Sequence, residues 1–467
     1  MSQNLAFITG QSRQRTNKRG KESRKERGRC SMAMEETPVW KLLIRLSAPV
    51  MLALLIQSIY NIVDSYFVAR YSAEGLAALS IIFPIQLLMT ALATGTGAGI
   101  NILISRMDGA GDTKSQKDII STGFFLGIMG ALIFAAAGTP GIRIYYQISS
   151  EQELVREYGI QYAQIIFALS LGMFVEAAGT KMLQAKSDMV LPMCAQVAGA
   201  VLNIVLDPFL IFGYCGFPEL GVRGAAVATV LGQWLAMAIV MIGFIRRYSP
   251  SFGRVTLHNC VRILKAGMPS ILLQSLYTVY IVGLNLILKL FSEDAVTVLG
   301  IYYKLQTFFF IPLLGLQQVI LPLISYNYGA GKMERARSVL RYSIVMSSVI
   351  MVVATAFFII MPKSLLSIFS TREEILMIGT TAFRIIALSF IPASFGLIFS
   401  VYFQGINRGK ESICITLLRQ VVLLVPLAWF LHFAGLEWVW LTFPITEVIV
   451  LAACLALYTK QQSGNRH

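Results

Sequence analysis

Two aspartates stand inside long apolar runs of this sequence, where a charged side chain is costly. A charge at the centre of a membrane helix costs roughly 2.5–3.5 kcal/mol on insertion scales, so Asp64 and Asp207 need a reason to be there. Tyr60 comes four residues before Asp64, and Asn203 comes four residues before Asp207. That spacing places each pair on one face of a helix. A phenol, an amide and two carboxylates therefore form a candidate chemical group.

The oxygens of these four side chains suit a cation or a proton. Hard cations bind carboxylate and amide oxygens, and a proton carrier needs a carboxylate whose pKa burial or a like-charged neighbour raises. Asp64 lies about five residues, and Asp207 about six, from the outer end of its run, which places both about 8–9 Å inside the outer membrane face. We predict an ion-coupling site here, with Na⁺ and H⁺ as alternatives.

Each of the four residues also has a purely structural interpretation. Asp64 could be an interfacial carboxylate exposed to outer water, and Asp207 with the following Pro208 could mark a break in its helix. Tyr60 could be an aromatic residue of the membrane interface. Asn203 could be a hydrogen-bonding residue between helices with no role in ion binding.

The elements that must position these side chains are membrane helices. Of the 467 residues, 56% are hydrophobic and 13% are charged, about half the charged fraction of a soluble domain. Runs of about twenty apolar residues span a hydrocarbon core, so a soluble multidomain enzyme is excluded and an all-α integral membrane protein is predicted. Twelve runs are found, at 41–69, 76–104, 119–140, 158–180, 189–213, 223–245, 263–290, 295–327, 338–361, 376–403, 412–433 and 438–458.

The sequence lacks the residue patterns of disulfide-rich proteins, metal sites, ATP-driven transporters and enzymes. The six cysteines are scattered singly and the three histidines lie far apart, so neither a disulfide framework nor a metal site of these residues is predicted. A Walker-type phosphate loop is missing, which argues against ATP-driven transport. A nucleophile–base constellation is missing as well. We expect a protein that is not an enzyme and has no cofactor.

Basic residues predict the orientation of the chain in the membrane. With the N-terminus inside, inner loops carry sixteen Lys and Arg residues and outer loops carry seven. Because basic residues favour the cytoplasmic side, we expect a multi-pass protein of the plasma membrane with both termini cytoplasmic. Residues 1–38 are predicted to be a disordered basic tail rather than a nucleic-acid-binding segment, and residues 461–467 a cytoplasmic C-terminal tail.

The sequence contains an internal repeat. Residues 104–111 read ISRMDGAG and residues 324–331 read ISYNYGAG, an offset of 220. At the same offset Pro49 matches Pro269, Gly95 matches Gly315, and Gln184 matches Gln404. Six spans in each half imply two lobes related by a pseudo-twofold axis along the membrane normal. The predicted domains are an N-lobe at 39–245 (spans 1–6), a cytoplasmic linker at 246–262 and a C-lobe at 263–460 (spans 7–12).

Five segments resemble the multidrug and toxic compound extrusion (MATE) family, over about residues 38–460. They are IYNIVDSYFVA (59–69), ISRMDGAGD (104–112), LNIVLDPFLIFG (202–213), LGVRGAAVATVLGQ (220–233) and YFQGINRGKES (402–412). The resemblance implies a single-chain secondary transporter that exports cationic, amphipathic compounds in exchange for Na⁺ or H⁺ by alternating access. A flippase for lipid-linked oligosaccharides or lipid precursors, which shares the architecture, is the alternative.

The resemblance also assigns roles to positions. It places the ion-coupling site on Tyr60, Asp64, Asn203 and Asp207, with Thr229 as a further polar position. In the second half, span 7 reads Leu273-Gln274-Ser275 where some members carry an acid, and the span-10 stretch 383–404 holds no carboxylate. We therefore predict coupling in the N-lobe.

Four further polar residues are candidates for the substrate cavity. Glu176 in span 4 could attract a cationic substrate, or it could extend towards the cytoplasm or pair with Lys181. Gln57, Gln274 and Gln404 could line the cavity, or they could hold helices together by hydrogen bonds.

Overall fold

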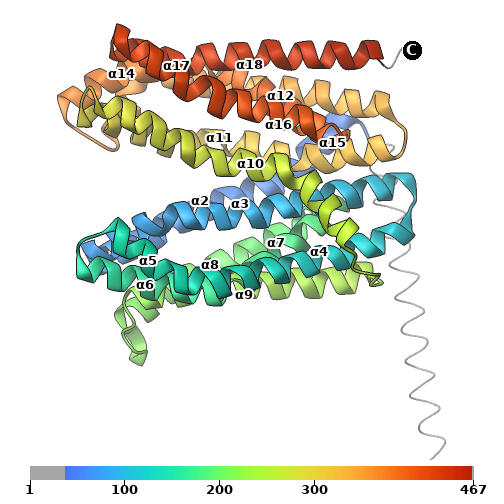
Figure 1. Ribbon diagram of the computed structural model, residues 1–467, viewed down its shortest axis with the longest axis horizontal. Helices are drawn as coiled ribbons and strands as arrows, with labels where there is room; N and C mark the ends of the chain where they lie inside the picture. Colours follow the sequence, from blue (N-terminus) through green and yellow to red (C-terminus); the bar gives the residue numbers. More distant parts are fainter. Residues whose placement is uncertain (1–36, 465–467) are drawn as a thin grey trace, which may run out of the picture.

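The computed structural model describes residues 37–464 and builds them from helices arranged as two stacked bundles (Figure 1). Residues 1–36 of the predicted basic tail and residues 465–467 lie outside the described residues. We call the bundle α2–α9 the N-lobe and the bundle α10–α18 the C-lobe. In Figure 1, α2 and α3 lie on the side of the N-lobe that faces α10 and α11.

The N-lobe is formed by the first six spans. Its elements are α2 (Val39–Tyr71), α3 (Ala73–Ala110), α4 (Thr113–Ile133), the π-helical segment η1 (Phe134–Gly138), α5 (Thr139–Ser149), α6 (Glu153–Ala168), α7 (Leu171–Ala185), α8 (Val190–Phe212), the short turn η2 (Tyr214–Gly216) and α9 (Val222–Tyr248).

The C-lobe is formed by the last six spans. Its elements are α10 (Leu257–Lys289), α11 (Glu293–Gly329), α12 (Met333–Ile360), α13 (Pro362–Ser367), α14 (Glu373–Ala387), α15 (Phe390–Gly405), α16 (Gly409–Leu417), the π-helical segment η3 (Leu418–Leu423), α17 (Leu424–Leu431), the short turn η4 (His432–Ala434) and α18 (Leu436–Gly464).

The twelve predicted apolar runs each coincide with a span. Within the described residues, ten helices are long and apolar enough to cross a membrane, and the pairs α6/α7 and α14/α15, each bent by 48°, complete twelve. The all-α, two-lobe architecture predicted from the sequence is confirmed. The connection between the lobes is shorter than the predicted 246–262, because α9 continues to Tyr248 and α10 already begins at Leu257.

The duplication is visible in how the second helix of each lobe begins and ends. The hydroxyl of Ser72 accepts a hydrogen bond from the backbone N–H of Gly75 at the start of α3, and Ser292 does the same for Ala295 at the start of α11. Both hydroxyls satisfy an otherwise unpaired N–H of the first turn. Gly111 and Gly331 follow the two helices, each with φ of 72°, a left-handed conformation that glycine adopts without strain.

The lobes contact each other backbone to backbone near these glycines. A Cβ atom added to Gly109 would overlap the carbonyl oxygen of Tyr326, and one added to Gly329 would overlap the carbonyl oxygen of Arg106. Arg106 and Tyr326 are themselves 220 residues apart, so the contact is reciprocal. We call the ends of the lobes that carry the loops 111–112 and 330–332 the Gly111 end, and the opposite ends, with Ser72 and Ser292, the Ser72 end.

Side-chain hydrogen bonds between the lobes are also found in the half of the molecule nearer the Gly111 end. Gln274 and Thr94 are paired at 2.9 Å near the middle of α3, and Lys181 Nζ donates to Gln318 Oε1 at 3.0 Å. For the described part of the chain, the side-chain hydrogen bonds between the lobes lie at this level or towards the Gly111 end. The lobes are therefore joined at the Gly111 end.

Replacing Gly329 with leucine should weaken this junction. The new side chain would meet the backbone of Arg106, which cannot rotate away, and overpacking of this kind costs about 1–3 kcal/mol. We expect a lower unfolding temperature for purified Gly329→Leu. Gly300→Leu on the same helix is the matched control, because a Cβ at Gly300 meets no atom within 4 Å. Equal unfolding temperatures for the two variants would contradict the proposed contact.

Candidate functional site

Four polar side chains from three helices meet inside the N-lobe. Helix α2 carries Asp64, α8 carries Asn203 and Asp207, and α9 carries Thr229. Asp207 is fully buried, and the other three are 2–9% exposed. The structure therefore brings together the two aspartates and the amide that the sequence singled out, together with the threonine of span 6.

Close packing of α8 against α9 makes this meeting possible. A Cβ atom on Gly199 would lie 2.6 Å from the carbonyl oxygen of Gly232, so the two backbones approach as only glycines allow. One turn further along, the Asn203 amide donates to Thr229 Oγ1 at 3.3 Å and to Asp207 Oδ1 at 3.5 Å. Pro208 lies inside the continuous helix α8, so the alternative of a helix break at Asp207 does not apply.

The cluster contains oxygen atoms that have no hydrogen-bond partner within residues 37–464. They are Asp64 Oδ1, Asn203 Oδ1 and Asp207 Oδ2. The two aspartates are close enough for their charges to interact, and neither forms an ion pair with a lysine or arginine of the described chain. Buried acceptors without a donor are costly, so the arrangement is suited to take up a proton or a hard cation.

Two tyrosines border the cluster. Tyr60 is half-buried and interacts electrostatically with both aspartates. Tyr162 of α6 is 4% exposed, interacts with Asp64, and its hydroxyl lies 3.5 Å from the Gln86 amide. Sequence reasoning missed Tyr162, because a single tyrosine in an apolar run gives no signal of its own. Tyr162 thus adds α6 to the three helices that contribute side chains to this cluster.

Glu176 is held by a hydrogen bond rather than by an ion pair. Thr180 Oγ1 donates to Glu176 Oε1 at 2.7 Å. Lys181, the partner considered from the sequence, instead donates to Gln184 Oε1 at 2.9 Å and to Gln318 Oε1 across the lobe boundary. The Gln196 side chain and the charge of Lys181 also interact with this carboxylate, and its role towards substrate stays a prediction.

The three glutamines predicted for the cavity occupy different environments. Gln57 is exposed on α2. Gln274 pairs with Thr94 of the other lobe. Gln404 is 6% exposed, and its amide donates to Ser270 Oγ at 2.9 Å and to the Ala266 carbonyl at 3.2 Å. Gln404 thus joins α15 to α10 within the C-lobe, and the structure does not bring the three together.

The C-lobe contains an acid that the sequence analysis overlooked. Glu447 of α18 is 3% exposed and forms an ion pair with Arg419, Oε1 to Nε at 2.7 Å. Arg419 and Glu447 belong to spans 11 and 12, whereas the prediction of N-lobe coupling rested on the absence of acids in spans 7 and 10. Acidic residues are rare in the apolar runs, and that rarity alone could have pointed to Glu447.

Comparisons with known proteins agree with this architecture. The family model described as MatE matches residues 49–209 and 269–430, one stretch in each lobe. The "FAD transporter" of Shewanella oneidensis is 25% identical over 434 residues, covering 90% of this chain and 94% of that protein. "Multidrug export protein MepA" of Staphylococcus saprophyticus is 27% identical over 432 residues, covering 91% and 94%. A solved MOP superfamily transporter from Pyrococcus furiosus superposes with a TM-score of 0.85 at 25% identity, covering 93% and 98%.

Neutralising Asp207 and neutralising Glu447 should have different effects on the unfolding temperature. Asp207→Asn removes a charge that has no basic partner, so we expect an unfolding temperature equal to or above that of the unsubstituted protein. Glu447→Gln leaves the Arg419 charge without its partner, which should cost about 3 kcal/mol. Thermal unfolding of both purified variants measures the difference. A stable Glu447→Gln beside an unstable Asp207→Asn would contradict this assignment.

Proposed function

Since this chain belongs to the MatE family of membrane transporters, we propose that it exports cationic, amphipathic compounds in exchange for Na⁺ or H⁺. Multidrug export relatives and the helical membrane fold make it a transporter and not an enzyme. The observation that carries the proposal is the N-lobe cluster, where Asp64 and Asp207 are buried with unpartnered oxygens. Such a site gains stability when a cation or a proton enters it.

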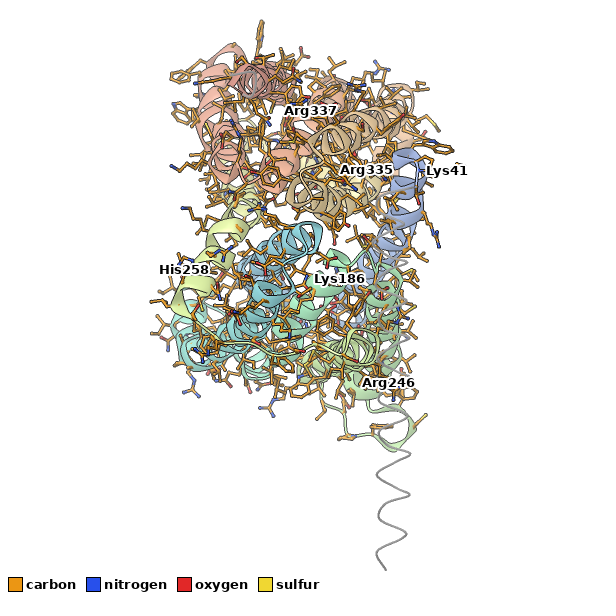
Figure 2. All side chains as sticks on the ribbon, turned by 90° about the vertical axis from the view of Figure 1, so that its right-hand side faces the viewer. Lys41, Lys186, Arg246, His258, Arg335 and Arg337 are labelled. Atoms are coloured by element: carbon orange, nitrogen blue, oxygen red, sulfur yellow. The ribbon has the colours of Figure 1, made fainter. Side chains whose placement is uncertain are left out.

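Two lobes that contact each other at one end support an alternating-access mechanism. We propose that the Gly111 end faces the cytoplasm, because basic residues gather there. Figure 2 looks onto that end and labels Lys41, Lys186, Arg246, His258, Arg335 and Arg337. The conformation described here would then be closed towards the cytoplasm, with the N-lobe cluster loaded from the Ser72 side of a plasma membrane.

Exchange requires the ion and the cargo to favour opposite states. A ligand shifts a conformational equilibrium only through its different affinity for the two states. Binding of Na⁺ or H⁺ at Asp64 and Asp207 would neutralise charge between α2 and α8, and so change how these helices pack. We propose that this change releases the cationic cargo outside and favours the return to the inward-open state, with the chain working as a monomer.

The charge of the N-lobe cluster favours cationic cargo. A flippase for a lipid-linked precursor would need basic residues to hold a pyrophosphate, whereas the N-lobe cluster provides carboxylates. The relative named FAD transporter adds a second candidate, export of a flavin dinucleotide. That cargo is anionic, so it would have to bind away from Asp64 and Asp207.

The substitution Asp64→Asn should abolish ion-driven efflux while leaving expression normal. An amide keeps the size of the carboxylate but can neither take up a proton nor supply negative charge to Na⁺. The measurement is ethidium efflux from intact cells that express the variant. Glu157→Gln is the matched control, because Glu157 is an exposed acid on α6 of the same lobe. Full efflux by Asp64→Asn would remove the cluster from the mechanism.

Removal of one ion gradient at a time should identify the coupling ion. We expect ethidium efflux by the unsubstituted protein to stop when the gradient of the coupling ion is collapsed. Efflux should continue when the gradient of the other ion is collapsed. The same cells report whether a flavin dinucleotide accumulates in the medium. Efflux that survives the loss of both gradients would disprove ion exchange.

A further inference from the structure

Lys181 is a basic side chain at the boundary between the lobes that the proposed function has not used. Its ammonium donates to Gln184 Oε1 of the same helix at 2.9 Å and to Gln318 Oε1 of α11, in the other lobe, at 3.0 Å. The Gln184 amide donates to the same Gln318 oxygen at 3.2 Å. Both acceptors of the ammonium are uncharged, so a positive charge lies between the lobes in the hold of two amide oxygens.

Helix α3 places Lys181 at this boundary. The Asn101 amide donates to the backbone carbonyl oxygen of Lys181 at 3.1 Å. A Cβ atom on Gly97 would lie 2.7 Å from Lys181 Cγ, so the glycine leaves room for the lysine stem. Both the backbone and the side chain of Lys181 are therefore positioned by residues of its own lobe, and the ammonium reaches across to the other.

The duplicated counterpart of this contact is apolar. The offset of 220 pairs each polar residue with an apolar one: Asn101 with Leu321, Lys181 with Val401, and Gln318 with Ala98. The three apolar residues pack in one hydrophobic cluster between α3 of the N-lobe and α11 and α15 of the C-lobe. Burial of apolar surface is enough to join the lobes there. Joining the lobes therefore does not by itself explain a charge at Lys181.

Glu176 gives the charge of Lys181 a function. It stands five residues earlier on α7, and the charges of the two side chains interact. Both side chains are half-buried, so neither is sealed inside its lobe. Glu176 is also the acid predicted to attract a cationic substrate. Because like charges repel, a cation bound at Glu176 and the ammonium of Lys181 oppose each other.

The position of the ammonium depends on how the lobes are arranged. Gln318 belongs to the C-lobe, so its hold on Lys181 is lost when the lobes separate at the Gly111 end. Helix α7 ends nearby at Ala185, and the next residue, Lys186, pairs with Asp108 beside the Gly111 loop. A lysine stem is long enough to carry its charge to water from a partly buried position. Separation of the lobes therefore lets the ammonium move away from Glu176.

We propose that Lys181 is an affinity switch for the cationic cargo. In the closed conformation, Gln318 holds the ammonium where its charge opposes a cation at Glu176. In the inward-open conformation, Lys181 turns to water and Glu176 binds the cargo. The cargo thereby favours the inward-open state, the preference that exchange requires of it. The inference rests on the function proposed above, because it needs cationic cargo.

Ethidium affinity of purified full-length variants tests the switch. Lys181→Gln removes the charge and keeps a side chain that can bond to the same amides. We expect it to raise ethidium affinity about tenfold, the scale of one charge interaction at a partly buried site. In the Glu176→Gln background the carboxylate charge is already gone, so Lys181→Gln should leave the affinity unchanged. Lys181→Arg keeps the positive charge and should retain the affinity of the unsubstituted protein.

A second variant tests the switch from the opposite lobe. Gln318→Leu removes the acceptor that holds the ammonium, so we expect it to raise ethidium affinity as well, although Gln318 lies in the C-lobe. It also keeps the test possible if Lys181→Gln does not fold. A lysine that served only to support the N-lobe would not transmit this substitution to ethidium affinity.

Arg106→Gln is the matched control. Arg106 also joins the lobes, with Nη2 donating to the Gly405 carbonyl oxygen at 3.4 Å. Its charge is not among those of the described chain that act on Glu176. Any loosening of the junction by Arg106→Gln should therefore change ethidium affinity by the same factor with and without Glu176→Gln.

Two results would overturn the switch. One is an unchanged or lower ethidium affinity in folded Lys181→Gln or Gln318→Leu. The other is a rise in Lys181→Gln that is equally large in the Glu176→Gln background. Either result leaves the proposed function standing, because the unsubstituted protein still binds ethidium. A purified protein that does not bind ethidium at all would contradict the proposed export of cations, and the switch with it.

Discussion

The burial of Asp64 and Asp207 without a basic partner is the constraint on which the rest of the N-lobe depends. Two carboxylates in an apolar interior repel each other and have lost their hydration. The protein supplies an amide at 3.5 Å from Asp207 but no ion pair to either aspartate among its described residues. The site lacks positive charge, and in the mechanism that we propose a transported ion supplies it. The cost of leaving the site empty would then be the reason why ion binding changes the packing of α2 and α8.

The duplication explains how one chain can hold two chemically different groups of buried polar side chains, one in each lobe. Helix caps at Ser72 and Ser292, glycines at 111 and 331, and reciprocal contacts at Gly109 and Gly329 show that the frame of the two lobes is the same. Side chains that point into the lobes have diverged instead. The position of Asp64 is occupied by the buried Leu284 in the C-lobe, and charge there comes from Arg419 and Glu447.

Much of the fold could be predicted from the sequence, because its signals extend over the whole chain. Apolar runs predicted the spans, and a constant offset of 220 predicted the two lobes. The N-lobe cluster could be predicted because acids are rare in apolar runs, so Asp64 and Asp207 are conspicuous. The offset also predicted which positions are equivalent between the lobes. These signals need no knowledge of neighbouring helices.

Contacts between helices could not be predicted in the same way. Lys181 was one candidate partner for Glu176, yet its ammonium donates to Gln318 of the C-lobe, a contact that spacing along α7 does not reveal. Glu176 accepts a hydrogen bond from Thr180, four residues further along the same helix. Tyr162 is one of eighteen tyrosines, and only its interaction with Asp64 in the folded chain distinguishes it from the others. Glu447 lies in span 12, and its partner Arg419 lies in span 11, so neither residue is part of the span-7 and span-10 positions that the resemblance points to.

Competition between ion and cargo at equilibrium tests the central claim most directly. Ethidium affinity is measured on the purified protein at increasing Na⁺ concentration and, separately, at decreasing pH. Because coupling between two ligands is reciprocal, we expect affinity to fall as the coupling ion is added, and Asp64→Asn to remove that dependence. Ethidium affinity that is independent of both ions, or a dependence that persists in Asp64→Asn, would contradict ion coupling at the N-lobe cluster.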